Sequence, residues 1–420
     1  MDMNEALATR RAALRERAFE IFKAGVAAAD PEAAVARALE ARPWSGKVLI
    51  AVGKAAPAMA RAALERVGPV EAALVVTNPE NATEIAGAEV IVAAHPVPDA
   101  GGLKAGRRVL ELLDNLKSGE GVLALISGGG SALLPAPVEG VSLEDKASVN
   151  ALLLGSGANI HQMNEVRQQL SHLKGGGFLR AAGPGRVRAL VLSDVLGDDL
   201  STIASGLTAG PIGTRESAAD LCRELGIWEQ LPGSVRAHLS KPDQEDASLP
   251  ECENEIIGSN AVSLAAMADA AGVEAVEVAL EGNVKDASEV IVKAGYSADT
   301  LLYGGETTVR LCEAPGLGGR NQQLALTIAG LADWPGPWVF LSGGTDGRDG
   351  PTDAAGGLVD DTSATRLKEA GIDLHEHLAR NDAYTALKAV GDLLMTGGTG
   401  TNVADLQVML REKSPAEPEA

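Results

Sequence analysis

A glycine-rich loop carries residues that could bind phosphate. The segment SGGGSALL, residues 127–134, follows an apolar run and offers successive backbone N–H groups that no side chain shields. This is the composition of an anion-binding nest that leads into a helix N-terminus, and a tight strand-to-helix turn is the structural alternative. The loop is not a Walker A loop, because no Lys follows its last glycine, and the Gly-x-Ser-x-Gly pattern of hydrolases is absent. The predicted phosphate-binding residues are Ser127, Gly128, Gly129, Gly130 and Ser131.

Two basic residues, Lys54 and Arg320, lie at the predicted start of helical segments. Lys54 follows the apolar run of residues 47–53, where an ammonium opposes the helix dipole unless an anion is shared. Arg320 follows two glycines and could clamp a phosphate or carboxylate through two hydrogen bonds. A solvated lysine and a surface ion pair are the respective alternatives. Both residues are predicted to be catalytic, and Glu306 and Asn321 are predicted to bind substrate beside Arg320.

Acidic residues gather in two further loops. The segment LSGGTDGRDGPTDAAGG, residues 341–357, holds six glycines and three aspartates, which repel one another unless a cation compensates them. The segment LVLSDVLGDD, residues 190–199, places Asp194 directly after an apolar run, and we predict that Asp194 is also catalytic. Helix capping by the aspartates of this second segment is the alternative. Because Mg²⁺ takes one or two carboxylates and keeps several waters, the predicted metal ligands are Asp194, Asp198, Asp346 and Asp349.

The helical segment 159–178 has its apolar residues on one stripe and ends at glycines. The stripe consists of Ile160, Met163, Val166, Leu170 and Leu173. The residues off the stripe are Asn164, Arg167 and Lys174, for which this pattern alone favours a solvated face.

Composition limits the partners. With 36 Lys and Arg against 57 Asp and Glu, the formal net charge is −21, which argues against nucleic acid but leaves small anions open. The three cysteines are dispersed, which fits a reducing compartment, and we expect a cytoplasmic protein. The charged N-terminus is neither a signal peptide nor a membrane span. The sequence does not set the oligomeric state, and a homodimer is one alternative.

Short apolar runs separated by helical segments predict the elements that position these loops. Runs without polar alternation indicate a parallel sheet that is covered on both faces, and ligands of such sheets bind at the carboxyl ends of the strands. The expected strands of a first region lie at residues 47–53, 72–79, 89–96, 121–130 and 187–194. Those of a second region lie at 273–280, 300–311, 337–347 and 403–410.

The domain boundaries follow from composition. A polar, proline-containing stretch at residues 232–255 is predicted to be a linker, and an apolar stripe predicts a helix near the N-terminus. We therefore expect an N-terminal domain over residues 1–240, a C-terminal domain over 255–412 and a disordered tail over 413–420.

Together the motifs resemble the glycerate 2-kinase family, whose C-terminal domain is called MOFRL. Between about residue 47 and residue 410 the chain carries, in order, VGKAAPAMA, HPVPDAGG, SGGGSALL, VRQQLSHLKGG, LSDVLGDD, GGETTVRL, GGRNQQLAL, GTDGRDGPTDAAGG and TGGTGTNVADL. The resemblance implies transfer of the γ-phosphoryl group of ATP to the 2-hydroxyl of D-glycerate with Mg²⁺. It also implies two α/β domains, one Rossmann-like and one smaller, with the active site in the cleft between them.

The resemblance also assigns residues. It implies that Lys54 and Arg320 are the functional pair, and Arg167 and Lys174, within a family motif, join the predicted substrate or phosphate ligands. Leu207 stands where the family usually has proline, which affects the expected loop shape. An NAD-dependent hydroxypyruvate reductase is the runner-up, although the three-glycine dinucleotide fingerprint is missing. A non-catalytic regulator that binds sugar phosphates is the third alternative.

Overall fold

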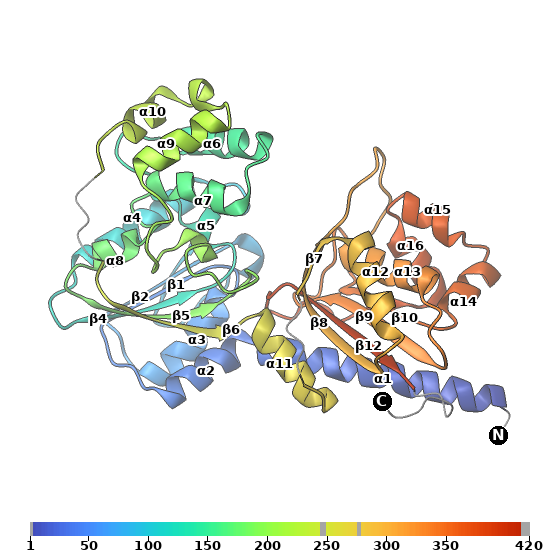
Figure 1. The fold of residues 1–420 in the computed structure, drawn as a ribbon. Coiled ribbons are helices and arrows are strands. Elements are labelled where there is room, and N and C mark those ends of the chain that lie inside the picture. The colour runs from blue at the N-terminus through green and yellow to red at the C-terminus, as the bar shows by residue number, and fades with distance from the viewer. Residues whose placement is uncertain (1–2, 244–248, 275–278, 413–420) are drawn as a thin grey trace. The chain divides into compact units, whose positions relative to one another are not determined.

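The computed structural model of the chain describes residues 3–243, 249–274 and 279–412. They form two compact units (Figure 1). The first unit comprises residues 31–257, and the second unit joins the residues up to 30 with those from 258 onward. The α/β class with two domains is confirmed, and the predicted tail over 413–420 lies outside the described residues.

The predicted parallel sheet forms the centre of the first unit. Its strand order is β3-β2-β1-β4-β5-β6, and every pairing from β3 to β5 is parallel. The strands are β1 Val48–Val52, β2 Ala72–Thr77, β3 Glu89–Val92, β4 Gly121–Ile126, β5 Arg186–Leu192 and β6 Cys252–Gly258. The order reverses between β1 and β4, so the loops that follow these two strands meet at the switch point where such sheets bind ligands.

Helices surround this sheet and build a second, helical core. The helices of the first unit are α2 Pro31–Ala41, α3 Ala56–Val67, α4 Ala100–Asp114, α5 Gly130–Leu133, α6 Leu143–Gly155, α7 Ile160–Gln169, α8 Gly177–Ala182, α9 Arg215–Glu224 and α10 Gly233–Leu239, with short 3₁₀ turns at Pro79–Asn81, Ile203–Ser205 and Trp228–Gln230. Apolar residues of α6, α7, α9 and α10 pack on one another. The predicted linker over residues 232–255 therefore contains α10 and the start of β6, because Val235 and Leu239 are buried in this core.

The second unit is built on a mostly antiparallel sheet. Its order is β11-β10-β9-β12-β8-β7, in which only β7 and β8 pair in parallel. The strands are β7 Ala279–Asn283, β8 Thr300–Thr308, β9 Trp338–Gly344, β10 Gly356–Asp360, β11 Leu393–Leu394 and β12 Asp405–Arg411. The predicted strand over 273–280 includes residues 275–278, which lie outside the described residues.

Two layers of helices cover this second sheet. One core contains residues of α1 Met3–Ala28 and α11 Asn260–Ala271, and the other contains residues of α12 Val284–Gly295, α13 Arg320–Leu331, α14 Ser363–Glu369 and α16 Ala383–Val390. The remaining helix is α15 Leu374–Ala379. The predicted N-terminal helix exists, but it belongs to the second unit rather than to the domain predicted over 1–240. The reason is that Ile21 and Phe22 are buried against Leu406 and Val408 of β12.

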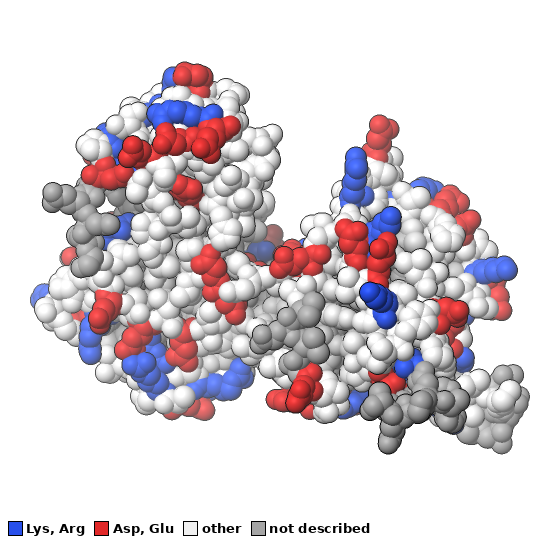
Figure 2. Space-filling model, in the orientation of Figure 1, with Lys and Arg blue, Asp and Glu red and all other residues white. Residues whose placement is uncertain are grey.

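On the face drawn in Figure 2, basic side chains lie among acidic ones. Within the described ranges, no helix combines the length and the apolar character that crossing a membrane requires.

Candidate active site

Lys54 and the glycine loop meet at the switch point of the first sheet. The backbone N–H of Lys54, after β1, donates to the carbonyl of Gly128, after β4, at 2.9 Å. The Ser127 hydroxyl accepts a hydrogen bond from Ala55 N at 3.1 Å. A Cβ at Gly53, where φ is +127°, would lie 2.1 Å from Ser127 Oγ, so this close approach requires glycine. The two loops predicted to bind phosphate are therefore joined directly.

Lys54 and His95 both lie against the loop. Gly129 has a φ of +84°, and a Cβ there would lie 3.2 Å from His95 Cδ2 and 3.4 Å from Lys54 Cγ. Burial, and then the positive charge of Lys54, lowers the pKa of His95 below its ordinary value. Sequence reasoning missed His95, although it begins the motif HPVPDAGG. A polar residue at the end of the apolar run that contains the third parallel strand was the signal that could have found it.

Asp194 lies on the other side of the same loop. It follows β5, the neighbour of β4, and a Cβ at Gly128 would lie 2.3 Å from Asp194 Oδ2. Asp198 adopts a left-handed conformation with φ of +55° in the turn that follows. The structure thus places the carboxylate of Asp194 beside the predicted phosphate nest.

A pocket lined by three cations lies next to the loop. Lys146 from α6, Arg167 from α7 and Lys174 line it together with Ser131 and Asn150. Lys146 and Lys174 are only 7% and 3% exposed. No Asp or Glu is among the described residues that line this pocket. We call the cavity lined by Lys146, Arg167 and Lys174 the cation pocket.

Neutral groups hold the cations in place. Lys146 Nζ donates to the carbonyl of Leu170 at 2.9 Å, and Arg167 Nε donates to Asn150 Oδ1 at 2.8 Å. Lys174 Nζ donates to both Ser131 O and Ser131 Oγ at 2.8 Å.

A chain of hydrogen bonds continues from Ser131 into the interior. The Ser131 and Ser205 hydroxyls lie 2.8 Å apart, and Ser205 Oγ donates to Asn164 Oδ1 at 2.9 Å. The solvated face predicted for Asn164 and Lys174 is wrong, since both are buried, whereas Ile160 on the predicted apolar stripe is 49% exposed. For Lys174 the reason is that the helix ends at Gln169, so the following residues leave the 3.6-residue period. Asn164 lies within the helix, where its buried amide oxygen accepts the hydrogen bond from Ser205.

Burial and mutual repulsion shift the ionisation of this cluster. Burial, and then the charge of Arg167, lowers the pKa of Lys146 to about 7. The pKa of Lys174 falls well below its ordinary value because of burial, Lys146 and Arg167. Burial also lowers the pKa of Arg167. Each shift favours the neutral form, because no opposite charge compensates the cations, and an anion in the pocket would favour their charged forms.

In the second unit, Arg320 is held by two carboxylates. Its Nε and Nη2 donate to Asp405 Oδ2 and Oδ1 at 2.6 and 3.0 Å, and its Nη1 donates to Glu306 Oε1 at 2.6 Å. Burial opposes the charge on Arg320, but the hydrogen bond and charge of Asp405 outweigh it and raise its pKa above the ordinary value. The ion pair considered from the sequence is therefore present, and the bidentate face of Arg320 already binds Asp405. Sequence reasoning missed Asp405, whose place at the start of a mostly apolar strand was the available signal.

Asp349 caps a helix. Its Oδ1 accepts from Asn321 N at 3.1 Å and its Oδ2 from Gln322 N at 2.8 Å, at the start of α13. The Asn321 side chain is 1% exposed and its Oδ1 accepts from Ser342 Oγ at 2.6 Å. Burial is the main cause that raises the pKa of Asp349 to about 6. Both carboxylate oxygens of Asp349 therefore accept hydrogen bonds from backbone N–H groups at the start of α13, and its predicted role as a metal ligand stays a prediction.

The other aspartates of this loop also have neutral partners. Asp346 Oδ1 accepts from Arg348 N at 2.9 Å, and Asp353 Oδ1 accepts from Tyr384 OH at 2.7 Å. Across the described ranges, no three His, Cys, Asp or Glu side chains are grouped so that they could hold a metal ion. Separate hydrogen bonds therefore compensate these carboxylates in part, and the cation expected for this loop stays a prediction.

Leu207 is a core residue. It is 2% exposed and packs in the central apolar cluster of the first unit. Its side chain therefore serves packing at the position where the family usually has proline.

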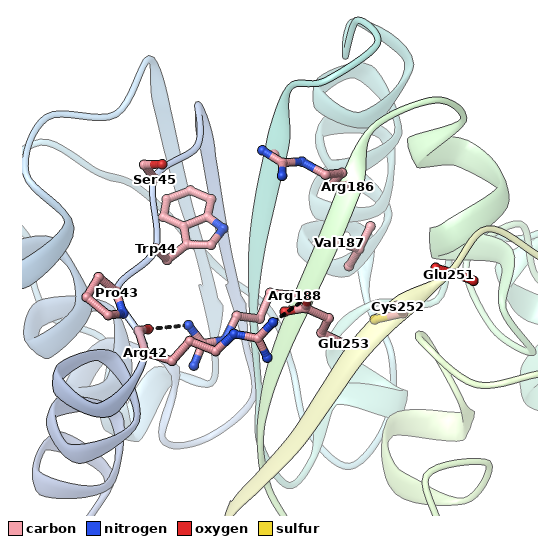
Figure 3. Close-up of a pocket in the computed structure, with 11 residues that line it drawn as sticks. Arg42, Pro43, Trp44, Ser45, Arg186, Val187, Arg188, Glu251, Cys252 and Glu253 are labelled. Carbon is pink, nitrogen blue, oxygen red and sulfur yellow. Dashed lines mark hydrogen bonds and ion pairs between the residues drawn. The ribbon is translucent and has the colours of Figure 1, made fainter.

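A second hollow lies at the other end of the first sheet. Figure 3 shows it at the amino ends of β4, β5 and β6, with Trp44, Arg186 and Arg188 on its walls. Arg188 already donates to the carbonyl of Arg42 at 2.5 Å and to Glu255 at 2.9 Å. Glu251 and Glu253 also line this hollow, so it is less suited to an anion than the cation pocket.

The first unit is an α/β domain whose doubly wound sheet carries the glycine loop and the cation pocket at its carboxyl end. Residues 17–240 match the domain of unknown function DUF4147, and residues 299–405 match the MOFRL family. The D-glycerate 2-kinase of Thermotoga maritima is 41% identical over 415 residues, which are 94% of this chain and 98% of that protein. A crystal structure of glycerate kinase from Thermotoga maritima superposes with a TM-score of 0.89 at 39% identity, covering 95% of this chain and 100% of that one. The chain belongs to the glycerate 2-kinase family.

A different name also occurs among the relatives. A protein of Agrobacterium vitis, provisionally named hydroxypyruvate reductase, is 41% identical over 412 residues, which are 93% of each chain. The runner-up activity predicted from the sequence therefore corresponds to a provisional name within the same family.

Proposed function

We propose that this protein is an ATP-dependent kinase that phosphorylates D-glycerate on its 2-hydroxyl, giving 2-phospho-D-glycerate and ADP. The observation that carries the proposal is the arrangement at the switch point, where Lys54 and the glycine loop adjoin a pocket that is lined by cations and by no described carboxylate. The identity with a D-glycerate 2-kinase over nearly the whole chain supports the same reaction.

Different residues of the first unit have different roles in the proposed reaction. Backbone N–H groups of the glycine loop bind phosphate oxygens, and the ammonium of Lys54 stabilises the charge that develops on the transferred group. Ser131 joins this loop to the cation pocket through its hydrogen bonds with Lys174. The acceptor and the phosphoryl group are thereby held side by side, which lowers the entropic part of the barrier.

Asp194 is the carboxylate that we assign to Mg²⁺. It lies beside Gly128, where its carboxylate would hold Mg²⁺ together with phosphate oxygens of ATP, since Mg²⁺ prefers oxygen ligands. When bound, Mg²⁺ neutralises charge on the phosphate oxygens. The ligand roles predicted for Asp198 and Asp346 stay predictions, as do a cytoplasmic location and a homodimer.

The chain argues against hydride transfer at this site. The loop after β1 reads GKAAPAM, in which only Gly53 fits the three-glycine dinucleotide fingerprint. A regulator that only binds sugar phosphates would need the nest but would not turn over.

An enzyme assay distinguishes these functions. Purified protein is given D-glycerate, ATP and Mg²⁺, and separately hydroxypyruvate and NADH. The kinase proposal expects ADP release that depends on D-glycerate and no oxidation of NADH. Oxidation of NADH would support the reductase instead, and binding without turnover would support the regulator.

A further inference from the structure

The geometry assigns the cation pocket of Lys146, Arg167 and Lys174 to the carboxylate of the acceptor. This assignment rests on the proposed function and deepens it, because it explains how the enzyme selects a hydroxy acid anion over a neutral polyol. The phosphoryl donor is then left to the glycine loop and Lys54.

The first argument is the unbalanced charge of the pocket. Among the residues that the structure describes, none of the three cations forms an ion pair with a carboxylate, and Lys146 and Lys174 are buried. Buried charges in proteins are normally paired or bound to a ligand of opposite charge. Two buried lysines and the half-buried guanidinium of Arg167, with no described carboxylate beside them, indicate an anionic ligand.

The second argument is the donors that remain. Arg167 uses Nε for Asn150, while its Nη1 and Nη2 have no hydrogen-bond partner within the described ranges. A carboxylate can accept two parallel hydrogen bonds from a guanidinium, and Lys146, with one hydrogen bond to Leu170 O, can donate to it as well. Asn150 and Leu170 therefore hold these cations in place before the ligand arrives.

The third argument is the shape and position of the pocket. Pro96, Pro135, Val149 and Leu170 supply its apolar walls. A carboxylate is small enough for such a site and loses its hydration there, which strengthens its attraction to the cations. Ser131 lines the same pocket and lies directly after the three glycines, so an acceptor anchored here presents its hydroxyl toward the loop.

The test compares a charged with a neutral acceptor. Lys146→Met and Arg167→Met are assayed with D-glycerate and with D-glyceramide, in which an uncharged amide replaces the carboxylate. We expect kcat/KM for D-glycerate to fall about 10- to 100-fold, because each variant loses a charged hydrogen bond. For D-glyceramide we expect a change of less than about threefold. Lys104→Met on α4, an exposed lysine, is the matched control and should leave both values unchanged.

Binding without ATP provides a second readout. Calorimetry should show weaker D-glycerate binding in both variants, with unchanged ATP binding. Lys146→Met is expected to fold, because it removes a buried charge and keeps most of the side-chain volume.

An equal fall for both acceptors, or unchanged D-glycerate affinity, would overturn the assignment. Failure of the wild-type protein to phosphorylate D-glycerate would instead overturn the proposed function, and the two failures are thus distinguishable.

Discussion

Lys174 is bound to Ser131 by two hydrogen bonds, from its Nζ to the carbonyl and to the hydroxyl oxygen, both at 2.8 Å. Ser131 follows the glycines of residues 128–130, so this contact joins the cation pocket to the glycine loop. A lysine that looked like a surface residue in the sequence is therefore the link between the two predicted binding functions.

Binding of D-glycerate should be coupled to protonation of Lys146. With a pKa of about 7 in the free protein, Lys146 is mostly neutral at pH 8, whereas a bound carboxylate favours the ammonium. The charged group that lowers this pKa is Arg167, which also faces the ligand. We expect proton uptake on binding at pH 8, and weaker affinity as the pH rises through 7. Calorimetry in buffers of different ionisation enthalpy measures the uptake, and Lys146→Met should reduce it, while Lys174, whose pKa is also lowered, remains. Equal heats in all buffers would contradict the prediction.

The lowered pKa of Lys146 also makes the free energy of unfolding depend on pH. Its folded pKa of about 7 lies below the ordinary value of 10.5, so the unfolded chain binds more protons between these pH values. This group's contribution to the free energy of unfolding therefore increases as the pH rises from 7 to 10.5. Thermal unfolding of wild type and Lys146→Met over this range should differ most at the low end, where the buried ammonium destabilises the wild type.

Lys54→Ala should lower kcat far more than it lowers stability. Loss of a group that stabilises the transferred phosphoryl oxygens typically reduces the rate about 10²- to 10³-fold. Steady-state kinetics and thermal unfolding of the variant test this, with Lys104→Ala as the matched control. A kcat within a factor of about two of wild type would return Lys54 to the role of a solvated lysine.

Arg320 should have a structural role that can be separated from catalysis. Arg320→Met leaves the Asp405 carboxylate, which is 1% exposed, without its two donors. We expect the free energy of unfolding of the second unit to fall on the order of 2–4 kcal/mol, because an unpaired buried charge remains while Arg320 itself is partly exposed. Urea denaturation measures this loss, and the double variant Arg320→Met/Asp405→Asn should regain most of it.

The double variant then tests the catalytic role predicted from the family motif. If Arg320 also acts on the substrates, the refolded double variant stays at least about 100-fold less active than wild type. Recovery of activity together with stability would show that Arg320 acts only by holding Asp405.

Removal of divalent metal should abolish turnover. In phosphoryl transfer the metal bridges phosphate oxygens, and the described residues provide Asp194 rather than a complete set of protein ligands. Activity should be lost in EDTA and restored by excess Mg²⁺. Full turnover in EDTA would be incompatible with the proposal.

Much of the first unit was predictable, because its strands are continuous apolar runs and its loops follow their ends. The parallel order then brings Lys54, Ser127 and Asp194 to one edge, as the rule for such sheets requires. The N-terminal helix was assigned to the other domain, because an apolar stripe predicts a buried face but not the sheet on which it packs.

The cation pocket was harder to predict, because its residues come from separate helices and a loop. Lys146 lies on the stripe of α6 that also buries Val149 and Leu153, a spacing that could have indicated a buried lysine. The pairing of Arg320 with Asp405 joins residues 85 positions apart, which no local pattern specifies. The loop of residues 341–357 was interpreted as a cation site because its aspartates repel one another, and hydrogen bonds to them were not considered. Asp349 shows that backbone N–H groups can also compensate a carboxylate.

The most direct measurement is the identity of the product. Protein, D-glycerate, ATP and Mg²⁺ are incubated, and the products are followed by ³¹P NMR against standards of 2- and 3-phosphoglycerate. The account predicts ADP and 2-phosphoglycerate in equal amounts. With glycerol as acceptor, it predicts no phosphorylated product. Formation of 3-phosphoglycerate, or release of inorganic phosphate without a phosphorylated acid, would contradict it.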